Sequence, residues 1–171
     1  MVSYLAALVC VAASVRDLSG IYFPPETYPV RAVALLKDSR AEGNMICYFD
    51  WGQYALWHLG PQIKVSMDGR RETVYSDEIY QQNINFIFGQ KDWDKLLREH
   101  DAQLALVKRQ FACFNLMKLQ ADWEFVYDDA VCGLFARKGT PQLAALKQAA
   151  KESPAMKAVP MDGVGLRFPG P

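Results

Sequence analysis

The chain has 171 residues, a length that suits one compact domain with a substantial core and is short for two. Hydrophobic residues make up 51% of it and charged residues 22%, which is the composition of a folded globular protein rather than a disordered one. Lysine and arginine together number 19, as do aspartate and glutamate, so the basic excess of a nucleic-acid-binding protein is missing. We therefore expect no nucleic-acid partner.

The N-terminal segment, residues 1–17, is apolar or small until Arg16-Asp17. It is shorter than the roughly 20 apolar residues of a spanning helix and lacks the leading positive charge of a signal peptide. We favour the end of a transmembrane helix whose first half lies upstream; a buried helix and an atypical signal sequence are the alternatives. Residues 18–28 contain Tyr22-Phe23 beside glycine and prolines, which predicts a linker at a membrane surface.

Apolar periodicity and capping residues predict alternating helices and strands after this linker. The predicted helices run from Pro29 to a cap at Gly43, over 51–59, from a cap at Ser76 to Gly89, onward from a cap at Asp92, over 114–119, and from Thr140-Pro141 to about Lys151. The predicted strands are 45–49, 63–67 and 104–107, followed by a hairpin of 123–127 and 130–136 that turns at Asp128-Asp129.

This order of elements predicts an α/β fold. We expect a mostly parallel sheet of about five strands with helical crossovers and a C-terminal antiparallel hairpin, spanning residues 29–152. The tail, residues 153–171, holds four prolines and three glycines, so we expect it to be mobile.

The cysteines and histidines do not indicate a metal centre. The four cysteines lie far apart in the sequence, with no C-x-x-C pair and no nearby histidine, whereas zinc ligands usually come in close pairs. Cys47 and Cys132 lie in apolar runs, where cysteine behaves as a small hydrophobe. We expect neither a metal nor another cofactor.

The densest group of candidate site residues follows the first predicted strand, as Tyr48-Phe49-Asp50-Trp51-Gly52-Gln53-Tyr54. A structural explanation makes Asp50 the N-cap of the next helix, with Gln53 completing a capping box. That explanation does not account for Gly52, since glycine inside a helix costs about 1 kcal/mol. Gly52 therefore predicts close approach by another backbone or by a ligand, and the candidate substrate-binding residues here are Tyr48, Asp50, Trp51, Gly52 and Tyr54.

A second candidate group, Asp68-Gly69-Arg70, follows the next strand. Arg70 is a two-pronged donor that suits a carboxylate or a phosphate, or it pairs within the protein with Asp68, Asp50 or Asp128. We expect an Asp50–Arg70 bridge between neighbouring strand ends, opening on a solvent-reachable hollow. Asp68, Gly69, Arg70 and Asp128 complete the candidate substrate-binding set; no P-loop, nucleophile elbow or H-E-x-x-H motif occurs, and we assign no catalytic residue.

Three motifs together resemble a known family. Tyr48-Phe49-Asp50-Trp51-Gly52 resembles the aromatic-aromatic-Asp-aromatic-Gly motif of the catalytic subunit of oligosaccharyltransferase, with Tyr48-Phe49 in place of two tryptophans. More closely, residues 29–137 resemble the C-terminal soluble domain of bacterial GT-C type polytopic glycosyltransferases. Those domains carry D-W-G-x-Y, D-G-R and W-x-x-V-Y-x-D elements, which stand here at Asp50–Tyr54, Asp68–Arg70 and Trp123–Asp128.

The resemblance implies a membrane-associated domain on the extracytoplasmic side, packed on an enzyme that takes sugars from a polyprenyl-phosphate carrier. Its partners would be the membrane, the polyprenyl-phosphate-linked sugar or the acceptor, and its own missing transmembrane region. The family's catalytic acid and metal ligands lie in that region, so the chain by itself is not expected to transfer sugar. The alternative is a non-enzymatic interaction or structural module anchored by one N-terminal helix.

Overall fold

The computed structural model describes residues 4, 6, 7, 9–12, 14, 21–23, 27–152 and 166–168, and it divides into two compact units. The larger unit lies within residues 28–159 and the smaller combines residues 1–27 with 160–171. In the smaller unit the described residues up to 14 are helical, and β1 (Ile21–Phe23) pairs antiparallel with β7 (Leu166–Phe168). These strands lie in the segments predicted to be the linker and the tail; residues 153–165 and 169–171 of that tail lie outside the described residues.

The membrane-spanning helix expected at the N-terminus is only partly covered by the described residues. Among these residues, no helix combines the length and apolarity needed to cross a membrane.

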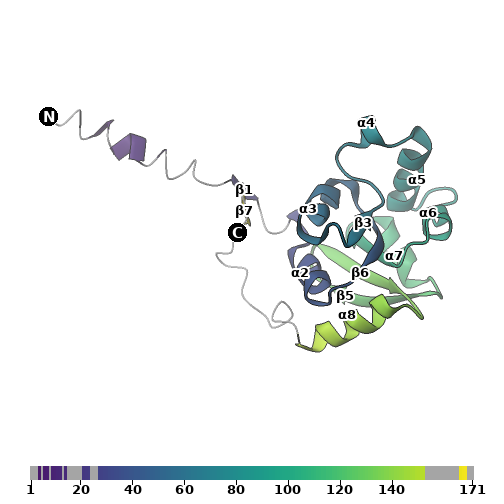
Figure 1. Cartoon of the computed structure of the whole chain (residues 1–171). Helices are drawn as coiled ribbons and strands as arrows, with labels where there is room; N and C mark the ends of the chain where they lie inside the picture. The colour runs from purple at the N-terminus through teal and green to yellow at the C-terminus, as the bar shows by residue number, and fades with distance from the viewer. Residues whose placement is uncertain are drawn as a thin grey trace. The chain divides into compact units, whose positions relative to one another are not determined.

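The larger unit alternates helices and strands (Figure 1). Its strands are β2 (Gly43–Cys47), β3 (Ile63–Val65), β4 (Leu104–Lys108), β5 (Trp123–Asp128) and β6 (Cys132–Arg137). Its helices are α2 (Val30–Asp38), α3 (Phe49–Leu59), α4 (Arg71–Val74), α5 (Asp77–Phe88), α6 (Lys95–Glu99), α7 (Ala112–Lys118) and α8 (Pro141–Glu152).

The five strands form one sheet in the order β3-β2-β4-β6-β5. β2 pairs in parallel with β3 and with β4, with Met45 opposite both Val65 and Leu104. β6 then pairs antiparallel with β4 and with β5. The α/β fold predicted from the sequence, with its parallel strands, helical crossovers and terminal hairpin, is confirmed.

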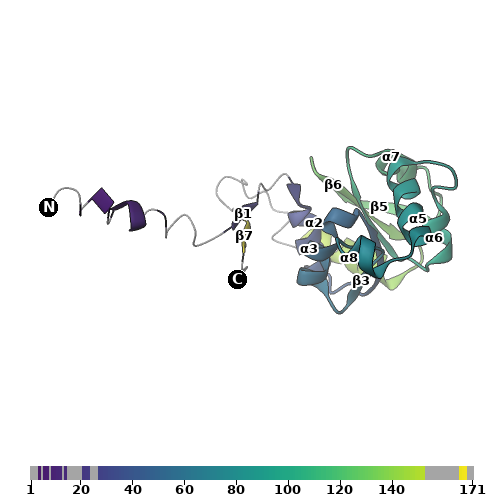
Figure 2. The same cartoon turned by 90° about the horizontal axis from the view of Figure 1, so that it is seen from above.

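Helices cover both faces of this sheet because its central strands alternate between two apolar cores (Figure 2). Met45, Cys47 and Leu104 face the core shared with α2, α3 and α8. Ile46 and Ala105 face the core shared with α5, α6 and α7. The sheet is therefore the middle of three layers, and its strand ends are where polar side chains gather.

The capping predictions for Ser76 and Gly89 are confirmed, and those for Gly43 and Asp92 are wrong. Ser76 caps α5, accepting a hydrogen bond from the Ile79 amide, and Gly89 closes the helix in the left-handed region at φ 64°. Gly43 is not a helix cap: α2 ends at Asp38, and Gly43 opens β2 with φ 122°. The helix expected after Asp92 begins two residues later, with Asp94 at its N-cap.

Candidate functional site

The carboxyl ends of four strands lie along one edge of the sheet. β2, β3 and β4 are parallel, and β5 runs the same way because two antiparallel pairings separate it from β4. The chain passes from β2 to β3 on one side and returns to β4 on the other, so β2 and β4 flank a topological switch point. Ligands of open α/β sheets bind at such points, outside the carboxyl ends of the strands.

Tyr48 and Asp50 lie where β2 ends. The Tyr48 hydroxyl donates a 2.6 Å hydrogen bond to Asp50 Oδ2. Burial, followed by the hydrogen bond to Asp50, raises the pKa of Tyr48 to about 12, so the phenol remains a donor at neutral pH. The Asp50 carboxylate is exposed and has a second oxygen that accepts no protein hydrogen bond among the described residues.

The predicted N-cap role of Asp50 is wrong. α3 begins two residues earlier than a cap at Asp50 requires, with Tyr48 at the N-cap position and Asp50 inside the first turn. The carboxylate still lies in the first turn of α3, near the positive end of the helix dipole. It accepts from the Tyr48 hydroxyl, and Tyr48 at the N-cap position makes no side-chain capping hydrogen bond.

Two cations lie over the aromatic rings of this edge. Lys108 Nζ lies 5.3 Å from the centroid of the Tyr48 ring and 5.7 Å from that of Phe111. The Arg71 guanidinium carbon lies 5.1 Å from the centroid of the Phe49 ring. Within the described part of the chain, Lys108 makes no ion pair, and its ammonium lies over the faces of two rings.

Asp68 and Arg70 form a closed pair within one turn. Arg70 donates from Nη2 to Asp68 Oδ2 at 2.6 Å and from Nε to both carboxylate oxygens at 3.1 Å. The backbone amide of Arg70 also donates to Asp68 Oδ1 at 2.8 Å. The hydrogen bonds from the Arg70 side chain hold the pKa of Asp68 below its usual value, against the opposing effect of burial.

The expected Asp50–Arg70 bridge is therefore replaced by an Asp68–Arg70 pair. The Asp68 side chain is 0% exposed and that of Arg70 is 57% exposed, so a buried carboxylate is neutralised from the solvent side. The cavity over β2 and β3 is lined by neither Asp50 nor Arg70, so the hollow expected between them is not found there.

Trp51, Gly52 and Tyr54 belong to the packing of α3 rather than to an open site. Trp51 is 1% exposed and lies in the core beneath the sheet's α2–α3–α8 face. A Cβ on Gly52 would lie 2.3 Å from the carbonyl oxygen of Met67. The close approach predicted at Gly52 is thus made by the backbone of Met67. α3 therefore packs directly against the loop after β3. The Tyr54 ring packs against the Tyr28 ring, with their centroids 5.1 Å apart.

Gly69 has a less demanding environment. A Cβ there would lie 3.4 Å from the side-chain amide of Gln53, an ordinary contact with a flexible group. Gly69 thus lies between Asp68 and Arg70 in the loop after β3, against the side chain of Gln53.

Asp128 lies at the same edge, at the end of β5, where it pairs with Arg109. Arg109 Nη1 also donates to the Asp129 carbonyl at 3.0 Å. Asp129 in turn accepts from the backbone amides of Val131 and Cys132, which fixes the turn of the hairpin. Asp128 is therefore positioned near the site by an arginine that follows β4.

Taken along the edge, four polar groups stand in the order of the strands: Asp68–Arg70, Tyr48–Asp50, Lys108–Arg109 and Asp128. The predicted set omitted Lys108, Arg71 and Phe111. A basic pair directly after a buried strand is the sequence signal for the first of them. The cations suit a negatively charged group, while the free Asp50 oxygen accepts from a hydroxyl.

Comparisons with known proteins identify no relative of this chain. No family model matches the chain, no curated protein matches it, and no solved structure matches it. Among the described residues, no group of three or more His, Cys, Asp or Glu side chains is arranged to hold a metal ion.

Proposed function

We propose that the chain is the extracytoplasmic C-terminal domain of a membrane glycosyltransferase-like protein that uses a polyprenyl-phosphate sugar donor. In this role the domain assists substrate binding and does not catalyse transfer alone. The proposal rests first on the resemblance of its three motifs to the soluble domain of GT-C type enzymes. It rests second on the groups gathered at the carboxyl edge of the sheet.

The observation that carries the proposal is the position of Lys108 beside Tyr48 and Asp50. Lys108 contacts the rings of Tyr48 and Phe111 and has no carboxylate partner among the described residues. A phosphate oxygen can approach such an ammonium without displacing an existing ion pair. Asp50, two residues from Tyr48, offers a free oxygen to a sugar hydroxyl.

The nine predicted binding residues divide into two groups under this proposal. Tyr48 and Asp50 contact the ligand together with Lys108. Trp51, Gly52, Tyr54, Asp68, Gly69, Arg70 and Asp128 hold the strand ends and the loop after β3 in place. Most residues of the D-W-G and D-G-R elements would then position the site without contacting the ligand.

The direct test is an NMR titration of the full chain, in nanodiscs, with citronellyl phosphate and with the neutral alcohol citronellol as the matched control. We expect the phosphate to shift the backbone amides of residues 48–50 and 108–111, and the alcohol to leave them unchanged. If the phosphate leaves these amides unmoved, the proposal fails and a non-enzymatic interaction module is favoured instead.

The proposal also makes a genetic prediction. The reading frame upstream of the Met1 codon should encode many apolar spans that supply the transmembrane region. A stop codon and a ribosome-binding site immediately ahead of Met1 would contradict this part of the proposal.

A further inference from the structure

Four aromatic residues at the carboxyl edge contact one another in a row, which we call the aromatic strip. The ring centroids of Phe49 and Tyr48 lie 4.9 Å apart, and those of Tyr48 and Phe111 lie 5.1 Å apart. The Phe88 centroid lies 5.5 Å from that of Phe111. Lys108 Nζ lies over the two middle rings, Tyr48 and Phe111. The aromatic strip therefore continues past the ammonium to Phe88.

Phe88 is the exposed end of the aromatic strip. It is the last residue of α5, and the two residues before it, Phe86 and Ile87, are 1% and 2% exposed because they face the core shared with α6 and α7. Phe88 itself is 48% exposed. A half-exposed ring that adjoins further rings offers a surface from which the apolar part of a ligand excludes water.

The packing of α5 against α7 fixes Phe88 beside Phe111. The chain turns at Gly89, where a Cβ would lie 2.5 Å from Leu116 Cδ1 and 3.2 Å from Ala112 Cβ. Phe111 is the N-cap residue of the same helix, α7. The two rings are therefore in place before a ligand arrives, so binding does not have to order them.

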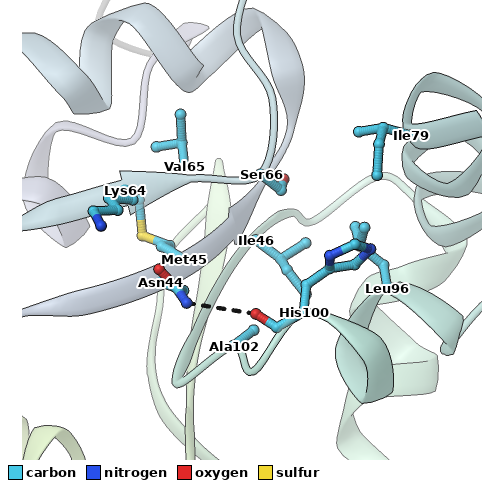
Figure 3. Close-up of a pocket in the computed structure, with 10 residues that line it drawn as sticks. All are labelled: Asn44, Met45, Ile46, Lys64, Val65, Ser66, Ile79, Leu96, His100 and Ala102. Carbon is cyan, nitrogen blue, oxygen red and sulfur yellow. Dashed lines mark hydrogen bonds between the residues drawn. The ribbon is translucent and has the colours of Figure 1, made fainter. Parts of the chain in front are cut away.

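The cavity over β2 and β3 is separate from the aromatic strip (Figure 3). Its lining includes His100 and Ala102, which precede β4, whereas Lys108 is the last residue of that strand. The lining includes none of the four rings. A ligand held at Lys108 therefore meets the aromatic strip rather than this cavity.

We propose that the aromatic strip binds the alkyl chain of a lipid-linked phosphate, with Phe88 setting the preference for a long alkyl chain over a short one. The inference rests on the proposed function, because it needs the phosphate to be held at Lys108. That ammonium has no carboxylate partner among the described residues and lies 5.7 Å from the centroid of Phe111, which Phe88 contacts. A phosphate monoester on an alkyl chain complements both the charge and the apolar rings.

The test compares the affinities of the full chain, in nanodiscs, for citronellyl phosphate and for ethyl phosphate, by NMR titration of the amides of residues 108–111. The two compounds share the phosphate monoester and differ in the alkyl chain. Phe88→Ala should weaken citronellyl phosphate by about fivefold, as the loss of about 40 Å² of apolar contact predicts, and leave ethyl phosphate unchanged. Uptake of citronellyl phosphate by the lipid is the same for every variant, so the comparison between variants isolates the contribution of the protein.

Two further variants control for the loss of apolar surface in general. Phe88→Leu retains an apolar side chain and should keep most of the preference for citronellyl phosphate. Leu119→Ala is the matched control, because Leu119 is 80% exposed but follows the other end of α7, and both affinities should equal those of the wild type. Nuclear Overhauser effects should also connect the citronellyl methyl protons with the ring protons of Phe88.

Three results would overturn this inference while the proposed function stands, provided that both phosphates still shift the amides of residues 108–111. The first is the same ratio of the two affinities in Phe88→Ala as in the wild type. The second is an equal loss of citronellyl phosphate affinity in Leu119→Ala. The third is a concentration-dependent dimer that Phe88→Ala abolishes without changing that ratio, which would make the aromatic strip an interface between copies. Failure of both phosphates to bind would overturn the proposed function and this inference together.

Discussion

Lys108 Nζ lies 5.3 Å from the centroid of the Tyr48 ring, although 60 residues separate the two in the chain. β2 and β4 are neighbours in the sheet, and each ends at this edge. The crossover through β3, α4, α5 and α6 therefore brings an ammonium beside a phenol and a carboxylate. This relationship defines the candidate site more closely than any one motif does.

Asp68→Asn should lower the free energy of unfolding at neutral pH by about 1 kcal/mol. Hydrogen bonds to charged groups contribute somewhat more, but the exposed guanidinium of Arg70 is screened by water. The folded pKa of Asp68 lies below its ordinary value of 3.8, so its contribution is present above that pH and is lost as the pH falls through the folded pKa.

Chemical denaturation between pH 7 and pH 2 measures this difference. The two stability curves should run parallel down to about pH 4 and converge in more acidic solution. Asp50→Asn is the matched control, because its exposed carboxylate contacts only the Tyr48 hydroxyl, and its curve should follow that of the wild type. A constant gap between wild type and Asp68→Asn across the whole range would contradict the assignment.

Gly52→Ala should destabilise the protein by about 1–3 kcal/mol, because the new methyl group would lie 2.3 Å from the Met67 carbonyl oxygen. This loss opposes, and exceeds, the gain of about 1 kcal/mol that alanine brings to a helix interior. Gly69→Ala is the control, since its methyl group meets only ordinary contacts. Thermal unfolding followed by circular dichroism compares the two; equal midpoints would show that α3 does not need a glycine here.

The cysteines should divide by reactivity. Burial raises the pKa of Cys47 and of Cys113 to about 12 and also raises that of Cys132. Cys10 is exposed. N-ethylmaleimide at pH 7.5, followed by peptide mass spectrometry, should label Cys10 rapidly and the three buried thiols only after denaturant is added. Rapid labelling of Cys47 in the native protein would contradict the tight packing of β2.

The fold was predictable because its local signals agree with one another. Buried strands such as Leu104–Lys108, the Ser76 cap and the Gly89 terminus each specify an element without reference to distant parts of the chain. A close approach at Gly52, by a backbone or by a ligand, was predictable for the same reason, since a glycine inside a helix needs a local explanation; the structure shows that the backbone of Met67 makes it.

The partners of the site residues were less predictable. Arg70 had three candidate carboxylates, and it pairs with that of Asp68, two residues away. Closing so short a turn costs less chain entropy than joining two strands. Asp50 suits an N-cap and a first-turn position equally, and the backbone geometry of Tyr48 decided between them. Lys108 could join the site only once β4 was known to lie beside β2.

The affinity of the full chain for citronellyl phosphate, measured by calorimetry for wild type, Lys108→Gln and Lys118→Gln, tests the carboxyl-edge site most directly. Lys118 is the matched control, because its ammonium also lies over a ring, 3.9 Å from the Phe114 centroid, but at the last residue of α7. The account predicts that Lys108→Gln weakens binding by about fivefold or more while Lys118→Gln binds as the wild type does. Equal affinities for all three proteins, or a loss only in Lys118→Gln, would contradict it.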